Sequence, residues 1–117
     1  MSEDLLAHID LSTLEMLKEV MEDDFLMLIS TYINDSEIRL QELNEASEAN
    51  ANESLRRAAH CFKGSSSNIG AQSLSLLCQQ LEQVAIDGDW SDISAKLQAI
   101  HQEANIVLSL LRQHFIN

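Results

Sequence analysis

The sequence predicts an all-α protein, an up-and-down antiparallel four-helix bundle with a short additional helix at its N-terminal end. Three observations lead to this prediction. Apolar side chains recur at three- and four-residue steps over most of the 117 residues. The composition, with no proline, three glycines and few aromatic residues, favours long helices over sheets. The breaks between the helical stretches are short, and short breaks make consecutive helices antiparallel neighbours.

The first nine residues are expected to form a flexible lead-in, and residues 10–117 a single bundle domain. A short helix opens this domain. Either Asp10 or Ser12 is placed to cap it, and Ser12 followed by Glu15 fits a capping box. The apolar side of this helix consists of Leu11, Leu14, Leu17 and Val20. We also expect the methionines of this region to fill the core, namely Met16, Met21 and Met27.

Two longer helices follow. The second is predicted over residues 23–48, and its inward positions are Phe25, Ile29, Tyr32, Ile33, Leu40 and Leu43. The third is predicted over residues 53–68. Asn50 with Glu53 three residues later marks its start, and Gly70 can take the left-handed geometry at its end. The apolar stripe of the third helix consists of Leu55, Ala58, Ala59, Phe62 and Ile69.

The last two helices are separated by a turn at Asp87-Gly88-Asp89. The fourth is predicted over residues 72–86, with a core stripe of Leu74, Leu77, Cys78, Leu81, Val84 and Ala85. The fifth is predicted over residues 91–115, with inward positions Ile93, Leu97, Ile100, Ala104, Val107 and Leu111. This near-heptad spacing is typical of helices that pack almost antiparallel. His114 continues the heptad and is expected to be partly buried.

The third helix carries the candidate site, at His60. At about 100° per residue, His60 points roughly 150° away from the apolar stripe and should face water. Gly64 lies one turn further along the same side, although a glycine inside a helix costs about 1 kcal/mol relative to alanine. A side chain at position 64 would lean over the imidazole of His60. We infer that Gly64 keeps the approach to His60 open for a large partner.

Positive charge is concentrated around His60, in a chain whose formal net charge is −12. Arg56, Arg57 and Lys63 are three of its seven lysines and arginines. Ser67 lies two turns from His60 on the same side and is a candidate hydrogen-bond donor. The three cations either stabilise an anionic group at His60 or belong to an ordinary solvated helix face.

The pattern around His60 resembles the histidine-containing phosphotransfer (HPt) domain family. The resemblance rests on His60-x-x-Lys63-Gly64-Ser65-Ser66, on Gly70 ten residues after the histidine, and on Leu77-Cys78 and Leu81-Glu82. It covers most of the chain, since the helix order of the family also fits. The resemblance implies the same helical bundle and reversible phosphorylation of His60 on a ring nitrogen, with Lys63 and Gly64 flanking it.

The resemblance also implies that the phosphoryl donor and acceptor are aspartates on separate receiver domains. Some members of the family use a glutamine 22 residues after the histidine to hydrogen-bond the far ring nitrogen, and here that position is Glu82. A carboxylate there can orient the ring, but it repels an incoming phosphoryl group if it is exposed. Glu82 either has this role or is an ordinary solvated residue, and Gln79 and Gln83 are nearby substitutes.

These features predict a free-standing phosphorelay carrier of a two-component system. His60 would accept a phosphoryl group from a receiver aspartate of a hybrid sensor kinase and pass it to the receiver of a response regulator. No nucleotide-binding signature occurs, so we expect no kinase activity. No cofactor is expected on this chain, and Mg²⁺ would belong to the receivers.

The alternative is a helical adaptor that carries no phosphoryl group. A metal-binding bundle is disfavoured by the spacing of His8, His101 and His114.

Composition also bears on location and partners. The negative charge argues against a nucleic-acid partner. No apolar run approaches 18 residues, so no transmembrane helix is expected, and the acidic N-terminal segment does not resemble a signal peptide. Cys61 and Cys78 do not make a disulfide framework and are expected to be small buried or boundary residues in a reducing compartment. We expect a cytoplasmic monomer.

Overall fold

The computed structural model describes residues 7–116 and is all-helical within that range. Its α-helices are α2 (Leu11–Met21), α3 (Phe25–Glu48), α4 (Asn52–Ile69), α5 (Gln72–Asp87) and α6 (Ile93–Leu111). A 3₁₀ turn (Glu22–Asp24) joins α2 to α3, and a π-helical turn (Arg112–Ile116) extends α6. The predicted helix order is confirmed, and the helix ends differ from the predicted ones by up to four residues.

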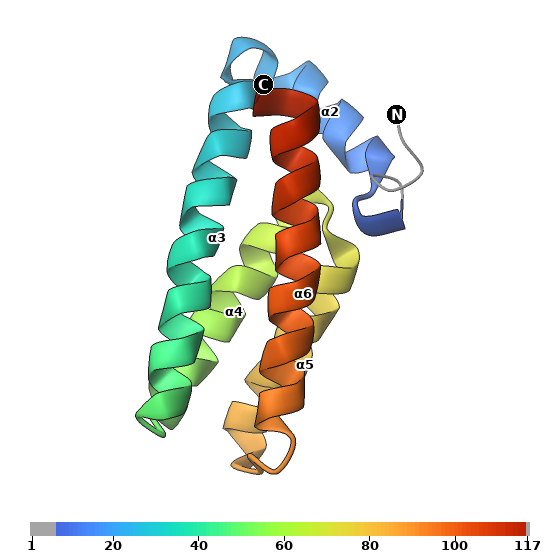
Figure 1. The fold of residues 1–117 in the computed structure, drawn as a ribbon. Helices are drawn as coiled ribbons and strands as arrows, with labels where there is room; N and C mark the ends of the chain where they lie inside the picture. The colour runs from blue at the N-terminus through green and yellow to red at the C-terminus, as the bar shows by residue number, and fades with distance from the viewer. Residues whose placement is uncertain (1–6, 117) are drawn as a thin grey trace.

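Helices α3 to α6 form the four-helix bundle, and α2 lies across one end of it (Figure 1). Each of the four packs against the next in the chain, and α3 and α6 close the ring. The contact between α4 and α5 is the most extensive. As predicted, the inward positions of α3 are buried, and the core of α4 is built on Leu55, Ala59 and Phe62, which are fully buried. The site on α4 is therefore carried by the most firmly packed pair of helices.

The short helix α2 differs from its prediction because it touches the bundle along a narrow side. Leu14 is buried, but Val20 is 72% exposed and Met16 54% exposed, and Met27, in the first turn of α3, is 69% exposed. The prediction that Val20, Met16 and Met27 face the core is therefore wrong. A helix that covers only one end of a bundle has few core atoms to pack against, so its apolar pattern overstates its buried face.

The packed domain begins before residue 10. Ile9 is buried in the core, and the Asp10 N–H donates to the Gly70 carbonyl at 2.8 Å. Residues 1–6 of the predicted lead-in lie outside the described residues. The capping box of Ser12 with Glu15 and the start of α4 at Asn50 are wrong, whereas the alternative cap of α2, Asp10, is confirmed. Asp10 occupies the N-cap position of α2, and Ser12 lies inside the helix with its hydroxyl donating to Asp10. Asn50 adopts a left-handed φ of 51° after the end of α3, a conformation that asparagine tolerates, and Ala51 precedes α4.

Gly70 ends α4 in the left-handed conformation, with φ of 90°, as the sequence predicts. The Ala71 N–H donates to the Ser66 carbonyl at 2.8 Å, which closes the helix in the manner of a Schellman motif. A Cβ atom at position 70 would lie 3.0 Å from the Thr13 Cβ and 3.1 Å from the Asp10 carbonyl oxygen. The turn between α4 and α5 therefore needs glycine both for its backbone angle and for the close approach of α2.

Replacement of Gly70 by alanine is expected to destabilise the protein by about 1–3 kcal/mol, because it adds steric crowding to a left-handed backbone. Denaturant unfolding at equilibrium measures the loss. Gly88 is a matched control, since it ends α5 with φ of 75° and a Cβ there meets nothing within 4 Å. Gly88→Ala should lose only the backbone contribution, about 1 kcal/mol. Equal losses in the two variants would show that the contact between Gly70 and α2 is unimportant.

The remaining expectations for the helices are largely met. Ile100, Ala104, Val107 and Leu111 of α6 are buried, and His114 is partly buried. Cys78 is buried, but Cys61 is exposed, so its predicted burial is wrong. Cys61 follows His60 directly and shares its outward side of α4. None of the described helices combines the length and the hydropathy that spanning a bilayer requires.

Candidate functional site

His60 lies near the middle of α4, on the side of the helix that faces away from the bundle core. Its neighbours at the buried positions, Ala59 and Phe62, have no exposed surface, whereas the imidazole is 60% exposed. The orientation predicted from the apolar stripe is therefore confirmed. Burial of Phe62 and Ala59 fixes the rotation of α4 about its axis, and this rotation presents the imidazole to solvent.

A carboxylate from the next helix holds the imidazole. The Oε2 atom of Glu82, on α5, lies 2.9 Å from His60 Nδ1. The Nζ atom of Lys63 donates to the other oxygen of Glu82, Oε1, at 2.7 Å. Glu82 therefore bridges two residues of α4 that are almost one turn apart. Its side chain is only 12% exposed, so the ordinary solvated role that the sequence left open does not apply.

The electrostatics of this bridge favour an ionised carboxylate. Burial alone would raise the pKa of Glu82, but the hydrogen bonds from Lys63 and His60 outweigh it, and the pKa lies below its ordinary value. An ionised carboxylate only accepts hydrogen bonds, so the proton of the bond to His60 must reside on Nδ1. In the neutral imidazole, the other ring nitrogen, Nε2, then keeps its lone pair. The arrangement selects one tautomer of an exposed imidazole and leaves Nε2 free to act as a nucleophile.

The lowered pKa of Glu82 makes a prediction about acid stability. A carboxyl whose pKa is lower in the folded state stabilises the protein above its unfolded pKa, and this contribution disappears as pH falls through the folded pKa. Glu82→Gln lacks the contribution, so its free energy of unfolding should depend less on pH below about pH 5 than that of the wild type. Urea unfolding at neutral and acidic pH measures the difference. Glu48→Gln, at the exposed end of α3, is the control and should keep the wild-type pH dependence.

Gly64 leaves an open space beside the imidazole. It is exposed, its φ is negative, and a Cβ atom built on it would meet nothing within 4 Å. Neither the backbone nor the packing therefore requires glycine at this position. The absence of a side chain leaves the surface of α4 open beside His60, one turn earlier on the same face.

In the part of the chain that the structure describes, no hydrogen bond or ion pair joins the other predicted site residues to His60, Lys63 or Glu82, although Arg56 lies close enough to Glu82 for their charges to interact. Arg56 donates to Glu53 through Nε at 3.1 Å and through Nη2 at 2.6 Å, within its own helix. Arg57 lines a shallow hollow towards α3, together with Arg39 and Glu42. Ser67 and Gln79 are exposed, and Gln83 donates to Asp87 on α5. The structure thus brings together His60, Lys63 and Glu82, beside Gly64, and of the predicted cation cluster only Lys63 contacts this group.

Sequence reasoning missed three polar residues near this group. Ser75 donates from Oγ to the Lys63 carbonyl at 3.1 Å, and Asn52 donates from Nδ2 to the Ala85 carbonyl at 2.6 Å. Trp90 Nε1 in turn donates to Asn52 Oδ1 at 3.0 Å. The only sequence signal was the seven-residue spacing between Ser75 and Glu82, which places both on the same face of α5.

An apolar groove of about 490 Å³ adjoins the side of α4 that carries the site. Its α4 wall includes Ser65 and Asn68, which follow Gly64 in the chain, and its other wall comes from α2 and α3. The apolar side chains that line it are Met16, Leu17, Met21, Leu28, Tyr32 and Ile69. Of the methionines predicted to fill the core, Met16 is exposed in this groove, whereas Met21 lines it while partly buried against the core.

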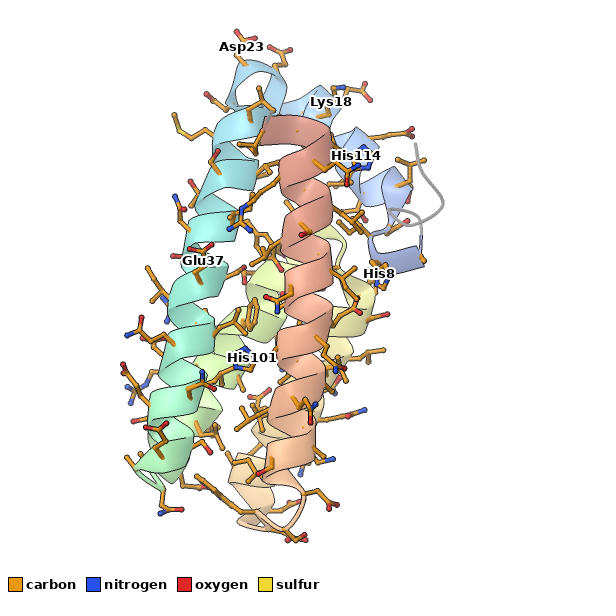
Figure 2. The ribbon with its side chains drawn as sticks, in the orientation of Figure 1. His8, Lys18, Asp23, Glu37, His101 and His114 are labelled. Atoms are coloured by element: carbon orange, nitrogen blue, oxygen red, sulfur yellow. The ribbon has the colours of Figure 1, made fainter. Side chains whose placement is uncertain are left out.

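The other histidines occupy different surroundings. In Figure 2, His101 lies between α3 and α6, and His8 lies beside the N-terminal segment. His101 Nε2 is 2.9 Å from Asn44 Oδ1, and His8 Nδ1 is 2.8 Å from Glu103 Oε2. His114 packs near Phe115. Over residues 7–116, no three His, Cys, Asp or Glu side chains are grouped so as to hold a metal ion. His60 alone among the described histidines combines a carboxylate partner with an open face over a glycine.

Comparison with known proteins places this chain in a wider group. The sequence model of the Hpt domain family matches residues 27–113. Among solved structures, the chain is similar to histidine-containing phosphotransfer protein B (HptB) from Pseudomonas aeruginosa PAO1. The identity is 39% and the TM-score 0.91, and the match covers 93% of this chain and 95% of that chain. A search of curated proteins found no match.

Proposed function

This chain belongs to the Hpt domain family, and we propose that His60 is the residue on which it carries a phosphoryl group. Members of the family are phosphotransfer carriers of two-component signalling, not kinases. The observation that carries the assignment of His60 is its exposed imidazole, whose Nδ1 is bonded to the buried carboxylate of Glu82. We further propose that the donor is the receiver domain of a hybrid sensor kinase and the acceptor the receiver domain of a response regulator.

The proposed transfer is a direct exchange between His60 and an aspartate. Nε2 attacks the phosphorus of an aspartyl phosphate, the N–P bond forms, and the aspartate leaves as a carboxylate. The proton remains on Nδ1, and the positive charge of the phosphorylated ring is paired with Glu82. The reverse exchange, on a second receiver, restores the neutral imidazole. Mg²⁺ would act from the receiver, where it neutralises charge on the transferred group.

Lys63 contributes a second positive charge beside the reaction. Its ammonium group is hydrogen-bonded to Glu82. Its positive charge therefore offsets the repulsion between that carboxylate and an approaching phosphoryl group. Lys63→Ala is expected to slow transfer about tenfold without abolishing it, since the site is open to water and charges are screened there. Rates of transfer from a phosphorylated receiver measure the effect. Arg57→Ala is the matched control and should transfer at the wild-type rate, because Arg57 is directed towards α3.

The groove between α2, α3 and α4 supports a receiver domain as the partner. A receiver that places its aspartate at His60 must also cover surface along α4, and the apolar groove starts there. Its methionines, the exposed Met16 and the partly buried Met21, adapt to different partner surfaces at small cost because their side chains are flexible. This suits a carrier that binds two receivers in succession. We therefore propose that both receivers bury this groove.

The proposed function is tested by incubating the protein with a panel of phosphorylated receiver domains. At least one receiver should label the protein, and the label should be acid-labile and stable to alkali, as expected of a phosphoramidate. Mass spectrometry at alkaline pH should locate the phosphoryl group on the peptide that contains His60. A label on a serine or on another histidine would refute the assignment.

A helical adaptor that carries no phosphoryl group is the second candidate, favoured by the same exposed groove. The two candidates differ in which residues are essential. An adaptor requires the groove and not the imidazole, so Met16→Asp should abolish its signalling while His60→Gln leaves it intact. A carrier requires both. The signalling output of the two variants in cells therefore separates these candidates.

A further inference from the structure

Two side-chain hydrogen bonds join α4 to α5 on either side of the Glu82 carboxylate. Ser75, in the first turn of α5, donates to the Lys63 carbonyl at 3.1 Å. Asn52, the first residue of α4, donates to the Ala85 carbonyl at 2.6 Å, close to the end of α5. Both bonds link a side chain of one helix to the backbone of the other. They therefore constrain the position of one helix along the other, and not merely their packing.

The Asn52 bond gives a donor to a backbone carbonyl of α5 that has no partner within its own helix. Ala85 is among the last four residues of the helix, whose carbonyls have no intrahelical partner. Asn52 supplies the missing donor from a neighbouring helix. Trp90 donates to the amide oxygen of Asn52, so the amide nitrogen must point towards Ala85. The indole thus sets the orientation of the amide.

The Ser75 bond lies at the opposite end of the site. Ser75 precedes Glu82 by seven residues, or two turns and about 10 Å along α5, and both residues face α4. Lys63 is hydrogen-bonded to both residues, because its carbonyl accepts from Ser75 and its ammonium group donates to Glu82. The position of Glu82 along α4 is thereby set from both sides.

This position matters because the two oxygens of the Glu82 carboxylate have different hydrogen-bond partners. One oxygen is 2.9 Å from His60 Nδ1, and the other is 2.7 Å from Lys63 Nζ. A helix rises by about 1.5 Å per residue, so a slip of α5 by even one residue would carry the carboxylate out of hydrogen-bond range of one partner. The imidazole would then lose the contact that keeps its proton on Nδ1.

We propose that Asn52 and Ser75 are positioning residues for phosphoryl transfer: together they fix the register of α5 on α4, which keeps Glu82 on Nδ1 and leaves Nε2 of His60 free. The consequence for transfer rests on the proposed function of His60. The consequence for the tautomer of His60 does not, because it concerns the unphosphorylated protein alone.

The test uses the variants Ser75→Ala and Asn52→Asp and their combination. Asn52→Asp removes the donor to Ala85 but keeps an acceptor for Trp90, and a carboxylate in the first turn of α4 favours that helix. Long-range ¹H–¹⁵N spectra of the His60 ring report which nitrogen carries the proton. In the double variant the share of the Nδ1-protonated form should fall, and transfer from a phosphorylated receiver should slow about tenfold. Ser75→Thr, which keeps the hydroxyl, should restore wild-type behaviour at that position.

Asn44→Ala is the matched control for the loss of an interhelical hydrogen bond elsewhere in the bundle. It removes the bond of 2.9 Å between Asn44 Oδ1 and His101 Nε2, which joins α3 to α6 and not α4 to α5. It should leave both the tautomer and the transfer rate unchanged. A wild-type tautomer in the double variant overturns the proposal, and so does an equal tautomer change in Asn44→Ala. If the wild type accepts no phosphoryl group, the proposed function fails, whereas the ring spectra still decide the positioning role.

Discussion

Replacement of His60 by glutamine is expected to abolish phosphorylation by every receiver that labels the wild type. Glutamine has no nucleophilic ring nitrogen, but its amide can still donate to Glu82. The fold should survive, because the imidazole is 60% exposed and its replacement removes no core atoms. Phosphoryl labelling measures the first expectation, and the far-ultraviolet circular dichroism and thermal midpoint measure the second.

His101→Gln is the matched control for this variant. His101 is a partly exposed histidine that is also hydrogen-bonded to a side chain of a neighbouring helix, Asn44 of α3. It should be labelled at the wild-type rate. Labelling that persists in His60→Gln would place the phosphoryl group elsewhere, whatever the result at His101.

The sequence was sufficient to place His60 because its orientation depends on one helix only. The apolar residues of α4 recur at helical spacing, so the side of the helix that faces water follows from the pattern itself. The same holds for Gly64, one turn away, and for Gly70, whose position after the last apolar residue indicates a helix end. For these three residues, local periodicity and turn chemistry were sufficient.

Contacts between helices were harder to predict, because they depend on how far one helix is shifted along the next. The sequence predicted that Glu82 lies near His60 but left its role open, because a residue at the edge of an apolar stripe can be either buried or solvated. Asn52 gave no signal and Ser75 gave only its seven-residue spacing from Glu82, because each donates to a backbone carbonyl of the partner helix and any residue can supply that carbonyl.

The remaining differences have equally physical causes. Arg56 was proposed as a cation of the site; its guanidinium group pairs with Glu53 three residues earlier, an i, i+3 pair that is visible in the sequence, and its role at His60 stays a prediction. Met16 was assigned to the core because apolar residues usually face it. At the edge of a groove, an apolar side chain follows the same spacing but stays exposed, and only the placement of α2 distinguishes the two cases.

Replacement of Gly64 by glutamine should separate stability from transfer, because the two are expected to respond in opposite directions. A Cβ atom at position 64 meets nothing within 4 Å, and removing a glycine from a helix stabilises it by up to about 1 kcal/mol. The glutamine side chain, however, leans back over His60 and occupies the space through which the receiver aspartate must approach. Reacting atoms must come within about 3–3.5 Å, so transfer should slow about a hundredfold. Thermal unfolding and receiver-to-His60 transfer measure the two effects.

Gly64→Ala is the control that separates the effect of a changed helix propensity from the effect of a long side chain over His60. It should be as stable as Gly64→Gln or more so, since alanine is the strongest helix former. Its single methyl group should obstruct the approach less, so its transfer rate should lie between those of the glutamine variant and the wild type. A wild-type rate in Gly64→Gln would refute the explanation of this glycine by access to His60. Destabilisation of both variants would instead show that α4 requires glycine for its own backbone.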